Sequence, residues 1–223
     1  MLINSLPVEL EKTKEDLLRM GRLVQEQIIK SVKALVEKDM DLAREVIAND
    51  NIVDQMELDL EKKCLGLIAL KQPMAKDLRL IGTVLRIIVD IERMGDLAED
   101  IAEIAVKLYE QTYIKPLIDI PRMARLAEDM IETALRAFID QDVSLAMKLI
   151  PMETEMDALY NQVFSELLVY MMKDQGNIAQ STALLLIAVH LERFGDHATN
   201  LAEMVIYVEE GRRVDLNELA RNE

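Results

Sequence analysis

The sequence has no tryptophan, one cysteine, seven glycines and five prolines among its 223 residues. The single thiol, Cys64, excludes a disulfide within the chain, which fits a reducing compartment and equally a cysteine-poor exported protein. We expect Cys64 to be a small buried apolar residue. Because glycine and proline are scarce, few residues interrupt a helix, and the abundant Ala, Leu, Ile, Met, Glu, Lys and Arg favour long helices.

Long apolar runs are also missing. The longest run, residues 183–189, is far shorter than the roughly 20 residues that a membrane-spanning helix needs. Residues 1–15 show no basic-then-apolar signal pattern. We therefore expect a cytoplasmic protein without a membrane span.

Basic residues are outnumbered. The chain has 26 Lys and Arg against 41 Asp and Glu, which gives a net charge of -15. Nucleic-acid binding depends on clustered Lys and Arg that neutralise phosphates, so this balance argues against a nucleic-acid partner. Cations and basic protein surfaces are the expected partners.

The chain contains an internal repeat. A shift of 103 residues aligns residues 20–54 with 123–157, where 10 of 35 positions are identical. A shift of 100 aligns residues 86–110 with 186–210, where 10 of 25 are identical. The shift changes between these blocks, as a loop of different length in the two copies requires. We therefore expect two copies of one structural unit.

Apolar residues recur at helical spacing through each copy, and no alternating stretch typical of a strand competes. The six expected helices span residues 6–37, 39–70, 74–110, 121–140, 142–172 and 178–209. Residues 111–120 form the expected linker. Short connections make successive helices antiparallel neighbours, so we predict an all-α fold of two tandem three-helix up-down bundles, residues 1–112 and 113–223.

The most distinctive repeated motif is Glu-Arg-x-Gly-Asp, at residues 92–96 and 192–196. Its two acidic residues are four apart, so on a helix they lie on one face, about one turn apart. The preceding helix of each copy carries a second acidic pair with this spacing: Asp50 with Asp54, and Glu153 with Asp157.

These pairs are predicted to face each other. In an antiparallel hairpin, residues equally distant from the loop centre lie opposite each other. The facing pairs share a midpoint at Pro73 in the first copy and between Asp174 and Gln175 in the second, within the expected loops. Asp100 and Asn200 lie one turn further along. The predicted site residues are Asp50, Asp54, Glu92, Asp96 and Asp100 in the first copy, and Glu153, Asp157, Glu192, Asp196 and Asn200 in the second.

Four carboxylates at close range repel one another unless a raised pKa, a nearby arginine or a bound cation offsets their charge. Hard oxygen ligands suit Mg, Ca, Mn or Fe and do not resemble a Cys/His structural zinc site. The competing interpretation is a solvated acidic face without metal, and recurrence in both copies favours metal. Glu57 and Glu61 align with Tyr160 and Phe164, so we expect these two glutamates to be surface charge.

Other residues of the repeat receive structural interpretations. Arg93 and Arg193 are expected to form salt bridges, and Gly95 and Gly195 to permit close helix approach.

Three residues near the predicted sites are interpreted separately. For His197 the alternatives are a place in a metal site and a surface histidine, and we expect the surface histidine. For Glu103 and Glu203, an outer ligand and a surface residue remain equal alternatives.

The duplicated plan, the two Glu-Arg-x-Gly-Asp motifs, the upstream acidic pairs and the run Gln-Pro-Met-Ala-Lys-Asp-Leu-Arg at residues 72–79 together resemble the PhoU family of phosphate-transport regulators. The resemblance covers nearly the whole chain. It implies two three-helix bundles, a cytoplasmic location and negative regulation of phosphate uptake and phosphate-starvation signalling. The implied partners are the cytoplasmic subunits of a phosphate ABC transporter, with peripheral membrane association, and a sensor histidine kinase; a homodimer is also expected.

The resemblance also implies metal at the acidic motifs, as multinuclear iron clusters, with Mn, Mg, Ca or Zn as alternatives. Asn200 is a weaker ligand than Asp100, so the two sites are expected to be unequal.

Two alternatives to a metal-binding regulator remain. One is an oxidase-type enzyme with a di-metal carboxylate centre, a class that uses Glu-x-x-His on two helices. No Glu-x-x-His occurs in the sequence, and there is no nucleophile constellation or glycine-rich phosphate loop, so we predict that the protein is not an enzyme. The other alternative is a metal-free helical scaffold.

Overall fold

The computed structural model describes residues 5–216 and 218. In these residues the structure is helical and without strands, as the composition predicts. The helices are α1 (Leu6–Glu37), α2 (Met40–Lys71), α3 (Ala75–Leu108), α4 (Asp119–Asp140), α5 (Val143–Ala146), α6 (Leu149–Lys173) and α7 (Ile178–Glu210), with a short 3-10 helix η1 (Gln175–Asn177) before α7.

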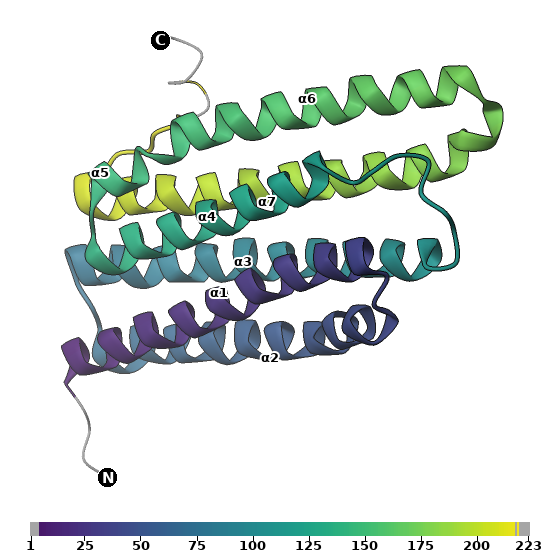
Figure 1. The fold of residues 1–223 in the computed structure, drawn as a ribbon. Coiled ribbons are helices and arrows are strands. Elements are labelled where there is room, and N and C mark those ends of the chain that lie inside the picture. The colour runs from purple at the N-terminus through teal and green to yellow at the C-terminus, as the bar shows by residue number, and fades with distance from the viewer. Residues whose placement is uncertain (1–4, 217, 219–223) are drawn as a thin grey trace.

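The prediction of two tandem three-helix bundles is confirmed. Helices α1, α2 and α3 form the first bundle, and α4, α5 with α6, and α7 form the second. The bundles lie side by side, with α3 against α7 and α1 against α4, while α2 and α6 lie on the outside (Figure 1). The buried apolar residues of both copies form one continuous core. The division of the chain after residue 112 stays a prediction.

Equivalent turns in the two copies use the same helix cap. The Asp39 side chain accepts hydrogen bonds from the backbone N–H groups of Asp41 and Leu42 at the start of α2. Asp142 does the same for Ser144 and Leu145 at the start of α5. A capping aspartate satisfies backbone donors that have no partner inside the helix. The Asp39/Asp142 identity in the repeat therefore fixes where the second helix of each copy begins.

One predicted helix was wrong. The single helix predicted over residues 142–172 is divided into α5 and α6, with a break at Met147 and Lys148. Pro151 explains the break. Its ring would clash with the carbonyl group of residue 147 in a continuous helix, and it has no N–H to donate. The equivalent position in α2 is Ala48, so α2 continues unbroken. The other predicted helix ends agree with the structure to within two residues.

The segment that connects the two copies forms hydrogen bonds with a helix of each copy. The Tyr113 hydroxyl donates to the carbonyl oxygen of Leu35 in α1, over 2.6 Å. On the other side, the Ile114 N–H donates to Oε1 of Gln180 in α7, over 2.7 Å. A linker bonded to both bundles limits the movement of one bundle against the other. None of the helices in the described part of the chain is long and apolar enough to cross a bilayer.

The glycines in the helices give a test of this packing. A Cβ at Gly21 in α1 would lie 2.5 Å from Cδ1 of Leu135 in α4, whereas a Cβ at Gly66 in α2 meets no atom within 4 Å. We therefore expect Gly21→Ala to lower the free energy of unfolding by about 1–3 kcal/mol through overpacking. Gly66→Ala, the matched control, should raise it by about 0.5–1 kcal/mol through helix propensity. Chemical denaturation measures both, and equal stabilisation by the two variants would contradict the α1–α4 packing.

Candidate metal centres

The α2–α3 hairpin brings together three of the predicted ligands of the first copy. Asp50 and Asp54 on α2 and Asp96 on α3 each offer a carboxylate oxygen, and these three oxygens lie within 4.8 Å of one another. All three residues are partly buried. Oxygen ligands lie about 2.0–2.6 Å from Mg²⁺ or Ca²⁺, so oxygens spaced in this way fit around one cation.

Glu92 and Arg93 complete one side of this cluster. Burial and the neighbouring Asp96 raise the pKa of the Glu92 carboxyl. Arg93 lies beside both, with Nη1 2.9 Å from Oδ2 of Asp96 and Nε 3.5 Å from Oε2 of Glu92. The predicted salt bridge of Arg93 is confirmed. Because Arg93 is largely exposed, this ion pair offsets only part of the repulsion among the carboxylates.

The deepest group in the first site is Asp50. Its Oδ1 atom is fully buried and has no hydrogen-bond partner among the described residues. Burial, followed by the charges of Asp54, Asp96 and Asp100, raises the Asp50 pKa to about 6. A buried carboxylate oxygen without a partner is costly, and a bound cation would satisfy it. By this measure the residues of the first site fit a metal ion.

Gly95 explains how the two helices come so close. A Cβ at this position would lie 3.3 Å from Cγ1 of Val53 and 3.4 Å from Oδ1 of Asp50. In the second copy, a Cβ at Gly195 would lie 3.3 Å from the Met130 side chain and 3.6 Å from Cγ of Met156. The predicted close approach at both glycines is confirmed.

Two further carboxylates, of Glu57 and Glu99, lie beside the first site. Glu57, expected to be surface charge, is partly buried, and its pKa is raised by burial and by the charges of Glu61, Asp54 and Asp96. Burial, then Asp50 and Glu103, raise the Glu99 pKa to about 7. Sequence reasoning missed both because the second copy has no acid at either position. Glu57 and Glu99 each follow a predicted ligand by three residues, and that spacing is the signal that finds them.

The second site has the same plan with a different interior. Glu153 is 7% exposed, and its carboxylate accepts a hydrogen bond from the Thr199 hydroxyl over 2.7 Å. Burial and contact with Asp196 raise the Glu153 pKa well above its usual range. Burial, Asp196 and Asp157 likewise raise the pKa of Glu192. Asp157 and Asp196 therefore lie within electrostatic reach of both glutamates. Among the described residues, however, only the first copy brings three acidic ligand oxygens within 4.8 Å of one another.

Asp100 and Asn200 lie toward the boundary between α3 and α7. The Asn200 amide donates to Oδ1 of Asp90 over 3.2 Å, and Oδ2 of Asp100 lies 3.9 Å from Nδ1 of His190. Asp100 still adds to the negative charge around Asp50. The expectation of a surface His197 was wrong, because its Nδ1 lies 2.8 Å from Oδ1 of Asp90 in a partly buried contact. These residues join the two copies.

The structure gives Glu103 and Glu203 different roles, a question that the sequence left open. Glu103 forms an ion pair with Lys107 on the surface, with Oε2 3.2 Å from Nζ. Glu203 accepts a hydrogen bond from the backbone N–H of Leu216 over 2.9 Å. Leu216 is fully buried, so Glu203 holds the segment after α7 against the helices.

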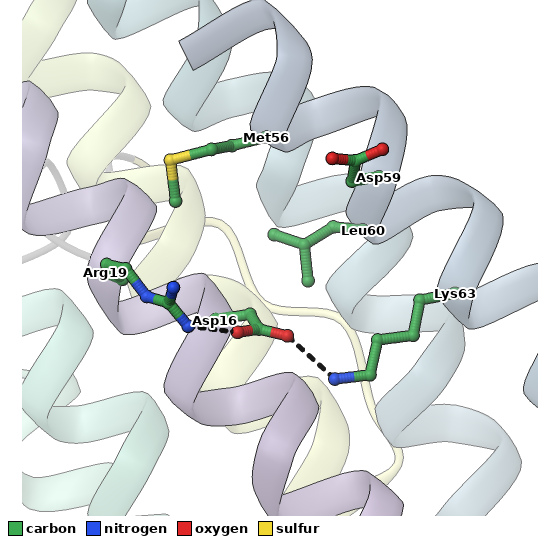
Figure 2. Close-up of a pocket in the computed structure, with 6 residues that line it drawn as sticks. All are labelled: Asp16, Arg19, Met56, Asp59, Leu60 and Lys63. Atoms are coloured by element: carbon green, nitrogen blue, oxygen red, sulfur yellow. Dashed lines mark hydrogen bonds and ion pairs between the residues drawn. The ribbon is translucent and has the colours of Figure 1, made fainter. Parts of the chain in front are cut away.

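A pocket of about 240 Å³ lies between α1 and α2, beside the same hairpin (Figure 2). It is lined by Asp16, Arg19, Met56, Asp59, Leu60 and Lys63. Asp16 bridges its two basic groups, with Oδ2 2.8 Å from Nζ of Lys63 and Oδ1 2.5 Å from Nη2 of Arg19. With Asp59 also in the lining, two acidic side chains balance the two basic ones, so the pocket has no net positive charge to attract an anion.

Comparisons with known proteins agree in family and fold. Residues 17–105 and 120–205 match the family described as the PhoU domain. The chain is 44% identical over 206 residues to a phosphate-specific transport system accessory protein PhoU homolog of Aquifex aeolicus, covering 92% of this chain and 93% of that protein. The corresponding protein of Clostridium acetobutylicum is 36% identical over 94% of this chain and 96% of its own.

Solved structures extend the comparison to the fold. The crystal structure of PhoU from Pseudomonas aeruginosa superimposes with a TM-score of 0.89 at 34% identity, covering 93% of this chain and all of that one. The phosphate transport system regulatory protein PhoU from Streptococcus pneumoniae gives a TM-score of 0.87 at 32% identity, covering 95% of this chain and 100% of that chain. The resemblance seen in the sequence is thus confirmed.

The raised pKa of Asp50 predicts how stability depends on pH in metal-free protein. Its folded pKa of about 6 exceeds the ordinary value of 3.8, so the folded state binds the proton more tightly than the unfolded state does. The free energy of unfolding should therefore fall as the pH rises from about 4 through about 6. In the presence of a chelator, Asp50→Asn should have a higher melting temperature than the wild type at pH about 8, and the difference should disappear only below pH about 4, where Asp50 is protonated in both states.

The control for this measurement is Asp41→Asn, since the Asp41 side chain is 97% exposed. This variant should follow the wild-type pH dependence. An Asp50→Asn variant whose melting temperature falls below that of the wild type at every pH would mean that the Asp50 charge stabilises the fold, contrary to the geometry.

Proposed function

This chain belongs to the PhoU domain family, and we propose that it is an accessory protein of phosphate-specific transport that represses phosphate uptake and phosphate-starvation signalling when phosphate is plentiful. The observation that carries the proposal is the coverage of the match. Both copies match the PhoU domain, and the Aquifex aeolicus relative named as a transport accessory protein aligns over 92% of this chain. Nearly the whole molecule is therefore shared with proteins of that name.

The proposed mode of action is docking without turnover. The partners are the cytoplasmic subunits of a phosphate ABC transporter and a sensor histidine kinase, which the protein meets in the cytoplasm as a homodimer. A net charge of -15 favours basic partner surfaces and speeds association with them. The long helices give an extended surface on which both partners have room to bind.

Metal ions belong to this proposal as part of the folded scaffold. Asp50, Asp54 and Asp96, with Glu92, would hold a cation in the first copy. The corresponding residues of the second copy are Glu153, Asp157, Glu192 and Asp196. Iron in a multinuclear cluster is the expected metal, with Mn, Mg, Ca or Zn as alternatives. The metal would supply positive charge that offsets the repulsion among carboxylates and stabilises the folded state.

Metal content is predicted to divide between the copies. When the protein is loaded to saturation, Glu92→Gln with Asp96→Asn should remove about half of the bound metal, and Glu192→Gln with Asp196→Asn about the other half, because each pair removes ligands from one hairpin only. Elemental analysis measures the loss. Loss of all metal from either double variant alone would indicate one shared site. Absence of metal from wild-type protein after loading would support a metal-free scaffold.

The regulatory role predicts a phenotype. Deletion of the gene should leave phosphate-responsive genes switched on when phosphate is plentiful, because the docked repressor is missing. The transporter subunits or the kinase should co-purify with the wild-type protein, and less so as salt rises, since the contact is partly electrostatic. Normal repression in the deletion strain, together with no co-purification of either partner, would rule out the assignment and leave the metal sites unaffected.

A further inference from the structure

The two carboxylate sites differ at one position close to their centre. The shift of 100 residues that aligns α3 with α7 pairs Glu99 with Thr199. Each residue follows the aspartate of its Glu-Arg-x-Gly-Asp motif by three positions, so each lies one turn along the same helix face. At this equivalent position beside the site, the first copy thus has the acid Glu99 and the second copy has the alcohol Thr199.

In the second copy the Thr199 hydroxyl already forms a hydrogen bond with the most buried carboxylate of the site, Glu153. The Thr199 hydroxyl donates to Oε2 of Glu153 over 2.7 Å, and both residues are buried, with exposed fractions of 1% and 7%. Asp196 lies beside Glu153 as well, and its negative charge raises the Glu153 pKa, so Thr199 is the partner that favours the carboxylate. The hydrogen bond from Thr199 therefore offsets part of the desolvation cost of this buried carboxylate within the protein.

In the first copy the same place lacks any such donor. Asp50 stands where Glu153 stands, and its buried Oδ1 has no hydrogen-bond partner among the described residues. Glu99 stands where Thr199 stands, and as a carboxylate it brings one more negative charge toward Asp50. Asp50, Asp54 and Asp96 already place three oxygens within 4.8 Å of one another. The first copy therefore has one more acidic side chain near its centre and no hydrogen-bond donor to its buried oxygen among the described residues, while Arg93 pairs with Asp96 and Glu92 at its exposed edge.

We propose that the site of the first copy is the tighter site for a divalent cation that prefers carboxylate ligands, and that residue 99 or its counterpart 199 sets this order. Glu99 adds negative charge toward the cation in the first copy. Thr199 takes the place of a cation in the second by donating its hydrogen bond to Glu153. The inference rests on the metal sites of the proposed function and adds the order in which they fill.

The order is tested by titrating Mn²⁺ alone into chelator-treated, full-length protein and measuring heat release. Titration of the variant Glu192→Gln with Asp196→Asn isolates the first site, and titration of Glu92→Gln with Asp96→Asn isolates the second. The first site should bind Mn²⁺ at least tenfold more tightly. Adding Glu99→Thr to the isolated first site should weaken it about 10- to 100-fold, the usual effect of a residue that supports metal ligands.

The reciprocal change uses a variant that keeps the shape of the side chain. Thr199→Val in the isolated second site removes the donor to Glu153 and should tighten Mn²⁺ binding severalfold. Glu103→Thr is the matched control for Glu99→Thr, because it makes the same change one turn further along α3 at a residue paired with Lys107. It should alter the affinity of the first site less than threefold. Melting curves of every variant in chelator establish that each one is folded.

The outcomes separate the two proposals. If both isolated sites bind Mn²⁺ with equal affinity, or if Glu99→Thr changes the first site no more than Glu103→Thr does, the order proposed here is wrong while the metal sites stand. If neither isolated site nor the wild type takes up Mn²⁺, the metal part of the proposed function fails and this inference fails with it.

Discussion

Close packing between helices that carry like charges is the constraint on which both sites depend. Gly95 lets α3 approach α2 until a Cβ would touch Val53 and Asp50. That approach buries an Asp50 oxygen that has no hydrogen-bond partner within the described part of the chain. Repulsion among carboxylates opposes the contact, while the apolar core on either side of it favours the contact. The raised pKa values of Asp50 and Glu99 express this conflict, which a cation would relieve.

The duplication also creates a boundary between the two copies. Asp90 bonds to Asn200 across α3 and α7, and Asp100 lies near His190; a shift of 100 residues turns one pair into the other. The two copies are thus related by an approximate twofold rotation. Charged and polar groups at this boundary fix the register of α3 against α7, and with it the distance between the two sites.

The copies nevertheless diverged where the chemistry is most sensitive. The two hairpins share one backbone plan but differ in the electrostatics of their interiors. In one copy Thr199 donates a hydrogen bond to Glu153, and in the other Glu99 places a second acidic group near Asp50. A duplicated fold tolerates this because the backbone geometry is set by the apolar core and the caps. The polar residues inside each hairpin are then free to change the affinity for a ligand without altering the fold.

The sequence by itself determined the helical class, the duplication, nearly all helix ends and the facing of the two acidic pairs, because these follow from periodicity and from the fixed rise of a helix. The sequence was also sufficient to predict the close approach of helices at Gly95. Only the tertiary structure decided which groups lie beside those pairs. Glu99, Thr199 and His197 owe their roles to burial and to partners on other helices, sometimes more than 100 residues away, as in the contact of His197 with Asp90. Spacing along one helix places Glu99 and Thr199 on the helix face of their site, but it does not identify their partners on other helices, so these roles appear only once the bundles are packed.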